Sequence, residues 1–544
     1  MPPRSTIPTF TIRFQLLGSS DCNNPSAISK EQILAWEKQG IIEYLGETKD
    51  VRPFVESASC VVLPSSYKEG VPRVLLEAMS MGKAIIATNI AGCKECVAPP
   101  FTPYENLLIG QNGILIPPKD THALSLAMTL LASNTLPNTA PNTLTQMGAN
   151  ARAFVKGRFD VARIVRCYKR AVSSCIDSAS GSHSPDCSHF RAVITDKVTP
   201  TLKCKQNKQS NTANLRILEE ANSQTELESS VQVDSKETAL CDDYAPNDSK
   251  NCGGAVVALT KFWDRSYLGG NDYPQNLVNQ SHCLPKAESP VLAFVSNTCF
   301  GMYNFRLQVL KSLQKSGFAI HIIAPFDAST QALNQEGFTT HNIRLDSRSL
   351  NPFKDLRTTY TLYKLLRRIR PALVFNYTIK PAIYSSSVCN ALKIPNIAII
   401  TGLGYVFIND KGEKSSLKKR VLRFIVCLMY RSALKATQEV WFLNDDDKQE
   451  FLSHKLIAQN QAFLLDSEGV DTEYFSPKVC KDSALQKTQG EIVFLLVARM
   501  LWDKGVGEFV EAAKMVQESM QKANKIESNG GGGHKQCRVA KNPL

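Results

Sequence analysis

Short apolar runs alternate with amphipathic segments along most of the chain. The first third contains five such runs, at 12–18, 41–46, 60–64, 84–88 and 112–116. Residues 289–477 contain five more, at 291–296, 320–325, 373–376, 397–400 and 440–443. The short runs predict strands, and the segments between them have the spacing of helices. Strands that alternate with helices favour a parallel sheet covered on both faces, so we expect an α/β fold with two doubly wound domains.

Two stretches lack this periodicity. Residues 179–288 are rich in Ser, Asn, Lys, Asp and Thr, and residues 523–544 include a run of glycines at 530–533. A segment with so little apolar surface cannot offset the conformational entropy that it would lose on folding. We therefore predict a disordered connector over 179–288 and a disordered tail over 523–544.

Two carboxylates lie on either side of a predicted helix start. Residues 67–79 read YKEGVPRVLLEAM, which places Glu69 and Glu77 eight positions apart. Pro72 suits the first turn of a helix, so Glu69 falls in the preceding loop and Glu77 about two turns inside the helix. The free backbone N–H groups of the helix start favour an anion. The arrangement can hold a nucleotide sugar, but it is also compatible with an ordinary amphipathic helix that has two solvated carboxylates.

This Glu-x7-Glu element resembles the donor-site signature of retaining glycosyltransferases of family four. The runs GKAIIATNIAGCKE at 82–95 and NGILIPPKD at 112–120 follow it in the order that is usual for the family's nucleotide domain. The resemblance implies a GT-B fold of two facing Rossmann-like domains, with the major part of the nucleotide-sugar-binding domain at 10–178. It implies that Glu77 binds the ribose of the donor. It further implies that Glu69 is a catalytic residue that holds the donor sugar, and that the donor is also bound by Gly70, Val71, Pro72 and Thr88.

The strand that should open this nucleotide domain stands at the far end of the chain. Residues 492–505 read IVFLLVARMLWDKG, and a helix is predicted from 506. By resemblance, Arg499 and Lys504 are the basic pair of the family, which would neutralise the charge that develops on the leaving diphosphate. Taken alone, they are two solvated cations in a loop. We assign residues 490–522 to the first strand and helix of the nucleotide-sugar-binding domain.

Residues 289–477 resemble the acceptor-side Rossmann-like domain of the same family. Three local runs narrow the resemblance: YNFR at 303–306, YTIKP at 377–381 and ITGLG at 400–404. They look like the subgroup that transfers hexosamines or hexoses onto polyprenyl-diphosphate-linked sugars in bacterial surface-glycan and N-glycan assembly. The acceptor-side candidates are Arg306, Lys380 and Thr401. Many family members have a His at the last of these positions, so a role carried over to Thr401 departs from the pattern.

The blocks of the family occur here in rotated order, because most of the nucleotide domain comes first. Either the chain is circularly permuted or two gene fragments have been joined. If it assembles, strand 492–498 should lie in one parallel sheet with 12–18 and 60–64. Arg499 and Lys504 should then face Glu77 within roughly 12 Å, the span of a bound nucleotide diphosphate. The connector should pack against neither domain.

The resemblance implies transfer with retention of a hexose or N-acetylhexosamine from a UDP-sugar to a lipid-linked glycan. The alternative is a rearranged, non-catalytic fusion of glycosyltransferase fragments. The family needs no metal or other cofactor. The eight His have no ligand spacing, and the one Cys-x-x-Cys, at 93–96, has no second pair.

The net charge of +13 calls for an anionic partner. Residues 415–435 predict a basic amphipathic helix that suits an anionic membrane surface, unless its apolar stripe faces the core. Nucleic acid is the rival partner, but no aromatic stacking platform accompanies the charge. Sixteen scattered Cys, no signal-peptide pattern and no apolar run of membrane-spanning length indicate a reducing cytoplasm. We therefore expect a peripheral protein on the inner face of the cell membrane that does not bind nucleic acid.

Overall fold

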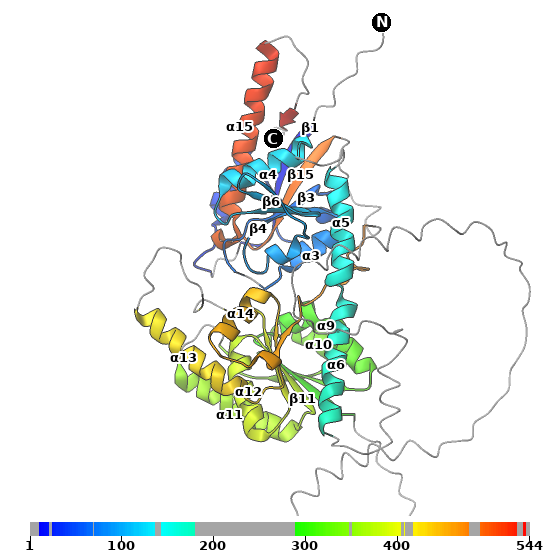
Figure 1. Ribbon diagram of the computed structural model, residues 1–544, viewed down its shortest axis with the longest axis vertical. Coiled ribbons are helices and arrows are strands. Elements are labelled where there is room, and N and C mark those ends of the chain that lie inside the picture. Colours follow the sequence, from blue (N-terminus) through cyan, green and yellow to red (C-terminus); the bar gives the residue numbers. More distant parts are fainter. Residues whose placement is uncertain are drawn as a thin grey trace, which may run out of the picture. The chain divides into compact units, whose positions relative to one another are not determined.

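The computed structural model describes residues 10–20, 24–68, 70–136, 143–179, 289–346, 351–403, 407, 417–477, 490–529 and 537–539. These residues build two α/β domains around mainly parallel sheets (Figure 1). The predicted fold class is therefore confirmed. The predicted connector 179–288 lies outside the described residues, except for Ala179, which is the last residue of a helix.

The sheet of the first domain combines strands from both ends of the chain. Its parallel strands follow the order β1, β15, β3, β4, β7. Their bounds are Phe10–Leu17, Glu491–Val497, Cys60–Leu63, Ala84–Thr88 and Gly113–Ile116. Strand β15 pairs with β1 along its length and with β3 on its other side, and Figure 1 shows the orange β15 beside the blue β1. The prediction that these three strands share one parallel sheet is confirmed.

Shorter strands extend this sheet at its two edges. The antiparallel pair β5 (Thr102–Tyr104) and β6 (Leu107–Ile109) adds to β7, while β2 (Glu43–Tyr44) and β16 (Cys537–Val539) pair with β1. Strands of two or three residues are too short for a periodic signal, which is why the sequence did not predict β5 and β6.

The end of the chain differs from the predicted disordered tail 523–544. Helix α15 spans Val506–Asn529, and β16 lies within the predicted tail as well. Residues 523–529 contain neither Gly nor Pro, so no residue that breaks a helix occurs before the glycine run that starts at 530.

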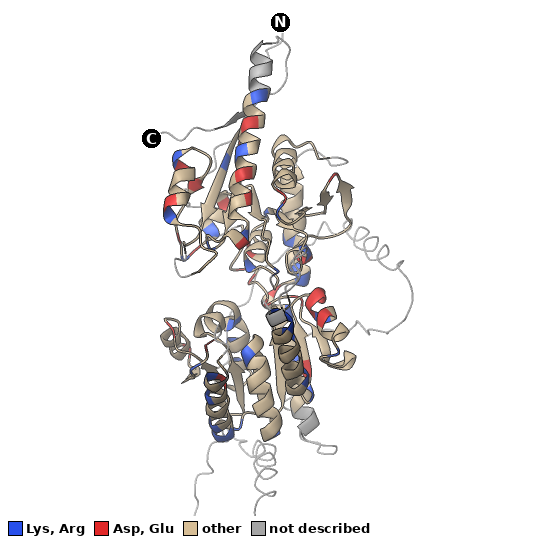
Figure 2. Cartoon of the chain, turned by 90° about the vertical axis from the view of Figure 1, so that its left-hand side faces the viewer, with Lys and Arg blue, Asp and Glu red and all other residues tan. Residues whose placement is uncertain are grey.

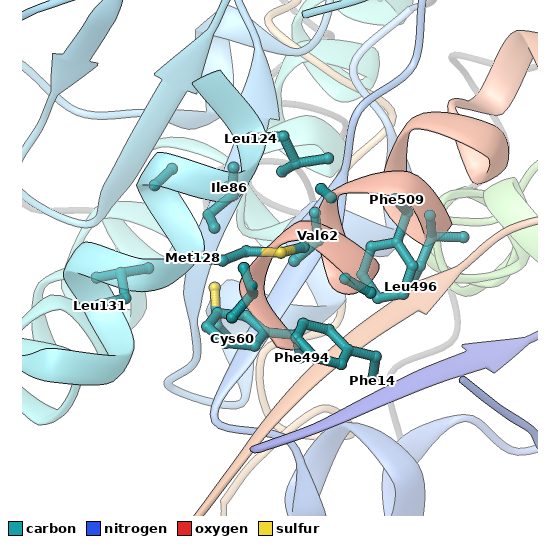
Figure 3. Close-up of a cluster of buried hydrophobic side chains, with 14 of the residues drawn as sticks. Phe14, Cys60, Val62, Ile86, Leu124, Met128, Leu131, Phe494, Leu496 and Phe509 are labelled. Carbon is teal, nitrogen blue, oxygen red and sulfur yellow. The ribbon is translucent and has the colours of Figure 1, made fainter. Parts of the chain in front are cut away.

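Both chain ends contribute to the hydrophobic core of the first domain. Its other helices are α1 (Lys30–Lys38), α2 (Arg52–Ser57), α3 (Arg73–Ser80), α4 (Thr121–Ser133) and α5 (Thr143–Arg158). Phe14 of β1 stacks on Phe494 of β15 at a centroid distance of 5.8 Å and meets Phe509 of α15 edge-on at 6.2 Å. Figure 3 shows these rings beside Met128 and Leu131 of α4. The two blocks therefore stabilise each other by burying their apolar faces together.

The sheet of the second domain is entirely parallel, in the order β10-β9-β8-β11-β12-β13-β14. In chain order its strands are Val291–Val295, Ala319–Ala324, Thr339–Asn342, Leu373–Tyr377, Asn396–Ile400, Glu439–Phe442 and Ala462–Leu464, numbered β8 to β14. Its helices are α9 (Cys299–Lys315), α10 (Thr330–Gln335), α11 (Pro352–Ile369), α12 (Ile379–Leu392), α13 (Leu417–Leu434) and α14 (Asp445–Ser453).

Helix α6 (Val161–Ala179) belongs to the first block in sequence but to the second core in space. The ring centroids of Tyr168 and Trp441 lie 4.8 Å apart. The hydroxyl of Tyr168 also shares a hydrogen bond of 2.7 Å with the hydroxyl of Tyr377. The sequence boundary placed this helix in the nucleotide domain, 10–178. Its apolar positions recur every three or four residues, and such a stripe packs wherever a sheet face is uncovered.

Candidate functional site

Helix α3 carries Glu77 at the end of the first sheet. Pro72 precedes the helix with extended backbone (φ −66°, ψ 120°), and its carbonyl accepts a hydrogen bond from the N–H of Leu75 at 3.1 Å. Glu77 is therefore the fifth residue of α3, a little more than one turn inside it, where the sequence predicted about two. The helix starts later than predicted because Pro72 takes the capping position, whose backbone is not helical.

The carboxylate of Glu77 has one charged partner within its own helix. The Nε of Arg73 donates to Oε1 of Glu77 at 2.8 Å, and the Glu77 side chain keeps only 14% of its surface exposed. Burial raises the pKa of Glu77, and the positive charge of Arg73 opposes this shift. The site thus holds a largely buried carboxylate whose ionisation depends on a neighbour.

The loop that carries Arg499 and Lys504 rests on the loop that leads toward α3. The carbonyl of Asp503 accepts hydrogen bonds from Ser65 Oγ at 3.1 Å and from the N–H of Ser66 at 3.0 Å. Gly505 has φ +76°, and a Cβ there would lie 2.1 Å from the carbonyl oxygen of Pro64, so this approach requires glycine. The structure therefore brings the predicted basic loop and the predicted donor loop together, although the separation of Arg499 and Lys504 from Glu77 stays a prediction.

The other predicted donor residues lie around the same loop, except Glu69, which falls outside the described residues. The buried hydroxyl of Thr88 donates to the carbonyl of Ser65 at 2.6 Å and so supports the loop. A Cβ on Gly70 would lie 2.8 Å from the carbonyl oxygen of Thr401, which places a donor-side residue next to an acceptor-side candidate. Val71 packs against the core. The roles assigned to these residues toward a donor stay predictions.

The two basic acceptor-side candidates are engaged inside the second domain. Arg306 is buried, pairs with Glu468 and lies over the ring of Tyr377 at 4.0 Å. Lys380 pairs with Asp355 Oδ1 at 2.7 Å, tying the start of α12 to α11. The sequence could not anticipate these pairings, because each partner comes from a different segment. A role for either residue toward an acceptor stays a prediction.

The apolar stripe of α13 is exposed rather than packed in the core. Val421, Phe424, Ile425 and Leu428 keep 47–70% of their surface accessible, which contradicts the core-facing alternative. Helix α11 adds exposed apolar residues that sequence analysis missed: Phe353, Leu356 and Tyr360. Their spacing of three and four was the available signal. Both helices pack against α12, and Figure 2 shows Lys and Arg in blue along the helices of this domain.

Two kinds of feature are absent from the part of the chain that the structure describes. None of its helices combines the length and the apolar character needed to cross a membrane. Within the same residues, no group of three or more His, Cys, Asp or Glu is placed to hold a metal ion.

Both domains are similar in sequence to glycosyltransferases. Residues 4–134 match the family described as Glycosyl transferases group 1, and residues 292–444 match the family described as Glycosyl transferase 4-like. Among solved structures, a glycosyltransferase from Rickettsia africae ESF-5 covers 47% of this chain and 69% of its own, at 15% identity and a TM-score of 0.30.

Two relatives of known activity are similar to part of the chain. One is the N,N'-diacetylbacillosaminyl-diphospho-undecaprenol alpha-1,3-N-acetylgalactosaminyltransferase of Campylobacter jejuni, 26% identical over 42% of this chain and 61% of the relative. Another is the UDP-Gal:alpha-D-GlcNAc-diphosphoundecaprenol alpha-1,3-galactosyltransferase of Escherichia coli, 23% identical over 40% of this chain and 55% of the relative. The matches thus span less than two thirds of each relative. Residues 4–134 and 292–444 are thus similar to two glycosyltransferase families, and together the two matches support a GT-B glycosyltransferase.

Proposed function

We propose that the protein is a retaining glycosyltransferase. It moves a hexose or N-acetylhexosamine from a UDP-sugar to a polyprenyl-diphosphate-linked glycan in surface polysaccharide or glycan assembly. The observation that carries this proposal is the contact between the basic loop and the donor loop, which come from opposite ends of the chain. The names of the two relatives support the class of acceptor.

The proposed roles follow the chemistry of the side chains. Arg499 and Lys504 neutralise the charge that grows on the leaving diphosphate, and cations already in place act without reorganisation. Glu77 accepts hydrogen bonds from the ribose hydroxyls, and Glu69 with the Gly70–Val71 backbone holds the sugar. The acceptor hydroxyl attacks on the face that the diphosphate leaves, and an oxygen of the donor phosphate takes its proton. No side chain of the protein is assigned as a general base.

We further propose that the rotated order of the blocks is a circular permutation. The break lies between α15, which ends at Asn529, and β1, which begins at Phe10, in a connection between a helix and the next strand. Such connections tolerate a break because it cuts few backbone hydrogen bonds of the fold. The pairing of β15 with β1 and β3 supports an assembled domain over a fusion of fragments that do not combine.

Purified protein tests the function in two steps. UDP-sugars are expected to raise the melting temperature, because a ligand that binds only the folded state stabilises it. Incubation with a polyprenyl-diphosphate-linked sugar is then expected to give a lengthened glycan with the anomeric configuration of the donor. If no UDP-sugar changes the melting temperature and no product forms, the chain is the non-catalytic fusion instead.

The Glu77→Ala variant should bind the donor more weakly by about 2–3 kcal/mol, roughly 30- to 150-fold in Kd, because charge-assisted hydrogen bonds to the ribose are lost. Titration calorimetry with UDP measures the change. The control is Glu511→Ala, which removes an exposed carboxylate from α15 of the same domain. Equal UDP affinity in the Glu77→Ala variant and the wild type would rule out this role.

We propose that the exposed faces of α11 and α13 bind an anionic membrane, so that the protein works on the inner face of the cell membrane. Their apolar side chains insert among the lipids, and each cation near the surface contributes about 1 kcal/mol. The acceptor's polyprenyl chain lies in the same membrane, which explains why an enzyme for this substrate would bind there.

Vesicle sedimentation tests this surface. Reversing the charge of Lys418, Lys419 and Arg420 to Glu is expected to weaken binding to anionic vesicles by about 100-fold or more, since three contributions of about 1 kcal/mol are lost. The paired substitution Phe424→Ser and Leu428→Ser should also weaken binding, but with little dependence on salt. Phe101→Ser, an exposed residue of the first domain, is the control. Equal binding of the wild type to neutral and anionic vesicles would contradict the charge-based part of the proposal.

A further inference from the structure

One side chain of α3, Arg73, contacts two groups that belong to different elements. Its Nε donates to Oε1 of Glu77 at 2.8 Å, across the four-residue spacing of a helix. Its Nη1 donates to the backbone carbonyl of Asn304 in α9, and its guanidinium carbon lies 5.4 Å from the ring centroid of Phe305. A guanidinium with fixed partners on two sides has little rotational freedom, so it can orient the carboxylate that it pairs with.

The ion pair with Arg73 affects the ionisation of Glu77, because the Glu77 carboxylate is largely buried. The Glu77 side chain is largely buried, and a carboxylate in such a place keeps its charge only if a cation compensates the lost hydration. The charge of Asp50 adds repulsion and raises the pKa of Glu77 further, while Arg73 lowers it. The ionisation of Glu77 is thus a balance of burial and Asp50 on one side and Arg73 on the other.

We propose that Arg73 is a positioning residue of the donor site, which keeps Glu77 ionised and aimed at the ribose of the nucleotide. The ion pair uses Oε1 and leaves Oε2 to a ribose hydroxyl of a nucleoside diphosphate. The inference rests on the proposed function, because it takes the ribose as the partner of Glu77. Arg73 lies between Glu69 and Glu77 in the sequence, and it acts on the nucleotide through Glu77 rather than by direct contact.

Nucleotide binding is expected to weaken in acid, because it requires the ionised form of Glu77. A protonated carboxyl accepts hydrogen bonds poorly, so a proton on Glu77 competes with the ribose. In the wild type, burial raises the pKa of Glu77 and the charge of Arg73 limits this rise, so Arg73 limits the pH range over which the proton competes. In Arg73→Gln the pKa rises, and nucleotide binding should begin to weaken at a higher pH. Below that pKa, Kd should increase about tenfold for each pH unit.

Calorimetric titration with UDP between about pH 5 and pH 8 measures the Kd as a function of pH, from which the pKa of Glu77 follows. Arg73→Gln is expected to bind UDP at least about tenfold more weakly at the acidic end, with the deficit shrinking toward the alkaline end. Arg73→Lys keeps a cation at this position and should restore most of the wild-type profile. A purely structural role would instead weaken binding equally at every pH.

The chain offers a closely matched control in Arg158→Gln. Arg158 pairs with Asp466 at 2.8 Å, with side-chain exposures of 35% and 16%, against 30% and 14% for Arg73 and Glu77. Its loss should lower the melting temperature without moving the pH profile of UDP binding. Melting curves also verify that the Arg73 variants are folded.

The outcomes separate this inference from the function on which it rests. If the wild type binds UDP and Arg73→Gln has the same pH profile, the inference is overturned and the function stands. If the wild type binds neither UDP nor any UDP-sugar, the donor-site assignment itself fails and the inference fails with it.

Discussion

Replacing Phe494 by Ala is expected to lower the free energy of unfolding of the first domain by about 3–5 kcal/mol, the usual cost of emptying a fully buried phenyl site. Phe494 is completely buried in β15 and stacks on Phe14 of β1, so the substitution leaves a cavity between the two ends of the chain. Urea denaturation followed by circular dichroism measures the change. The transition that belongs to the first domain should move to lower urea, while that of the second domain stays in place.

Phe424→Ala is the matched control for this experiment. Phe424 keeps 70% of its surface exposed, so its truncation should change stability by no more than about 0.5 kcal/mol. An unchanged first-domain transition in Phe494→Ala would mean that the C-terminal block does not share the core of the N-terminal block in solution. The proposed permutation would then lose its main support.

Replacing Arg499 or Lys504 by Ala is expected to lower kcat by about 100- to 1,000-fold, as is typical when one group that stabilises developing negative charge is removed. The affinity for the donor should fall much less, because the charge on the diphosphate grows mainly in the transition state. Initial rates of sugar transfer at saturating donor measure the effect. The result would support the assignment of both residues to the leaving group.

Lys514→Ala provides the comparison, since Lys514 is an exposed cation of α15 in the same C-terminal block. It should transfer sugar at the wild-type rate. A wild-type kcat in Arg499→Ala and in Lys504→Ala would remove the basic loop from the mechanism, even though that loop rests on the donor loop.

Part of the sheet of the first domain was predictable, because its longer strands are apolar and the resemblance joins the blocks from the two parts of the chain into one sheet. The run at 492–498 needed two neighbouring strands to cover its backbone and side chains, and β1 and β3 supply them. The helix after Pro72 was likewise predicted, and Glu77 lies within it, about one turn from its start rather than two. These features depend on local spacing, which the sequence displays directly.

Features that depend on a distant partner were not predictable. Helix α6 packs on the second core because Tyr168 finds Trp441 and Tyr377 there, and its own apolar stripe does not specify which sheet it covers. Arg306 and Lys380 were expected to reach an acceptor, but their nearest charged groups are Glu468 and Asp355. A run of residue types reveals what a side chain can do, whereas its position among other segments decides which partner it meets.

The place of β15 between β1 and β3 sets the order in which the nascent chain can fold. Thr11 pairs with Glu491, so the second of these partners is synthesised long after the first. The strands of the second domain, from β8 to β14, are all synthesised before β15. That domain can therefore fold before the first sheet is complete, whereas β1 and β3 have no partner along their facing edges until β15 is synthesised. Unfinished chains can associate through such unpaired strand edges. The protein is therefore most prone to aggregation before β15 has been synthesised and has paired with β1 and β3.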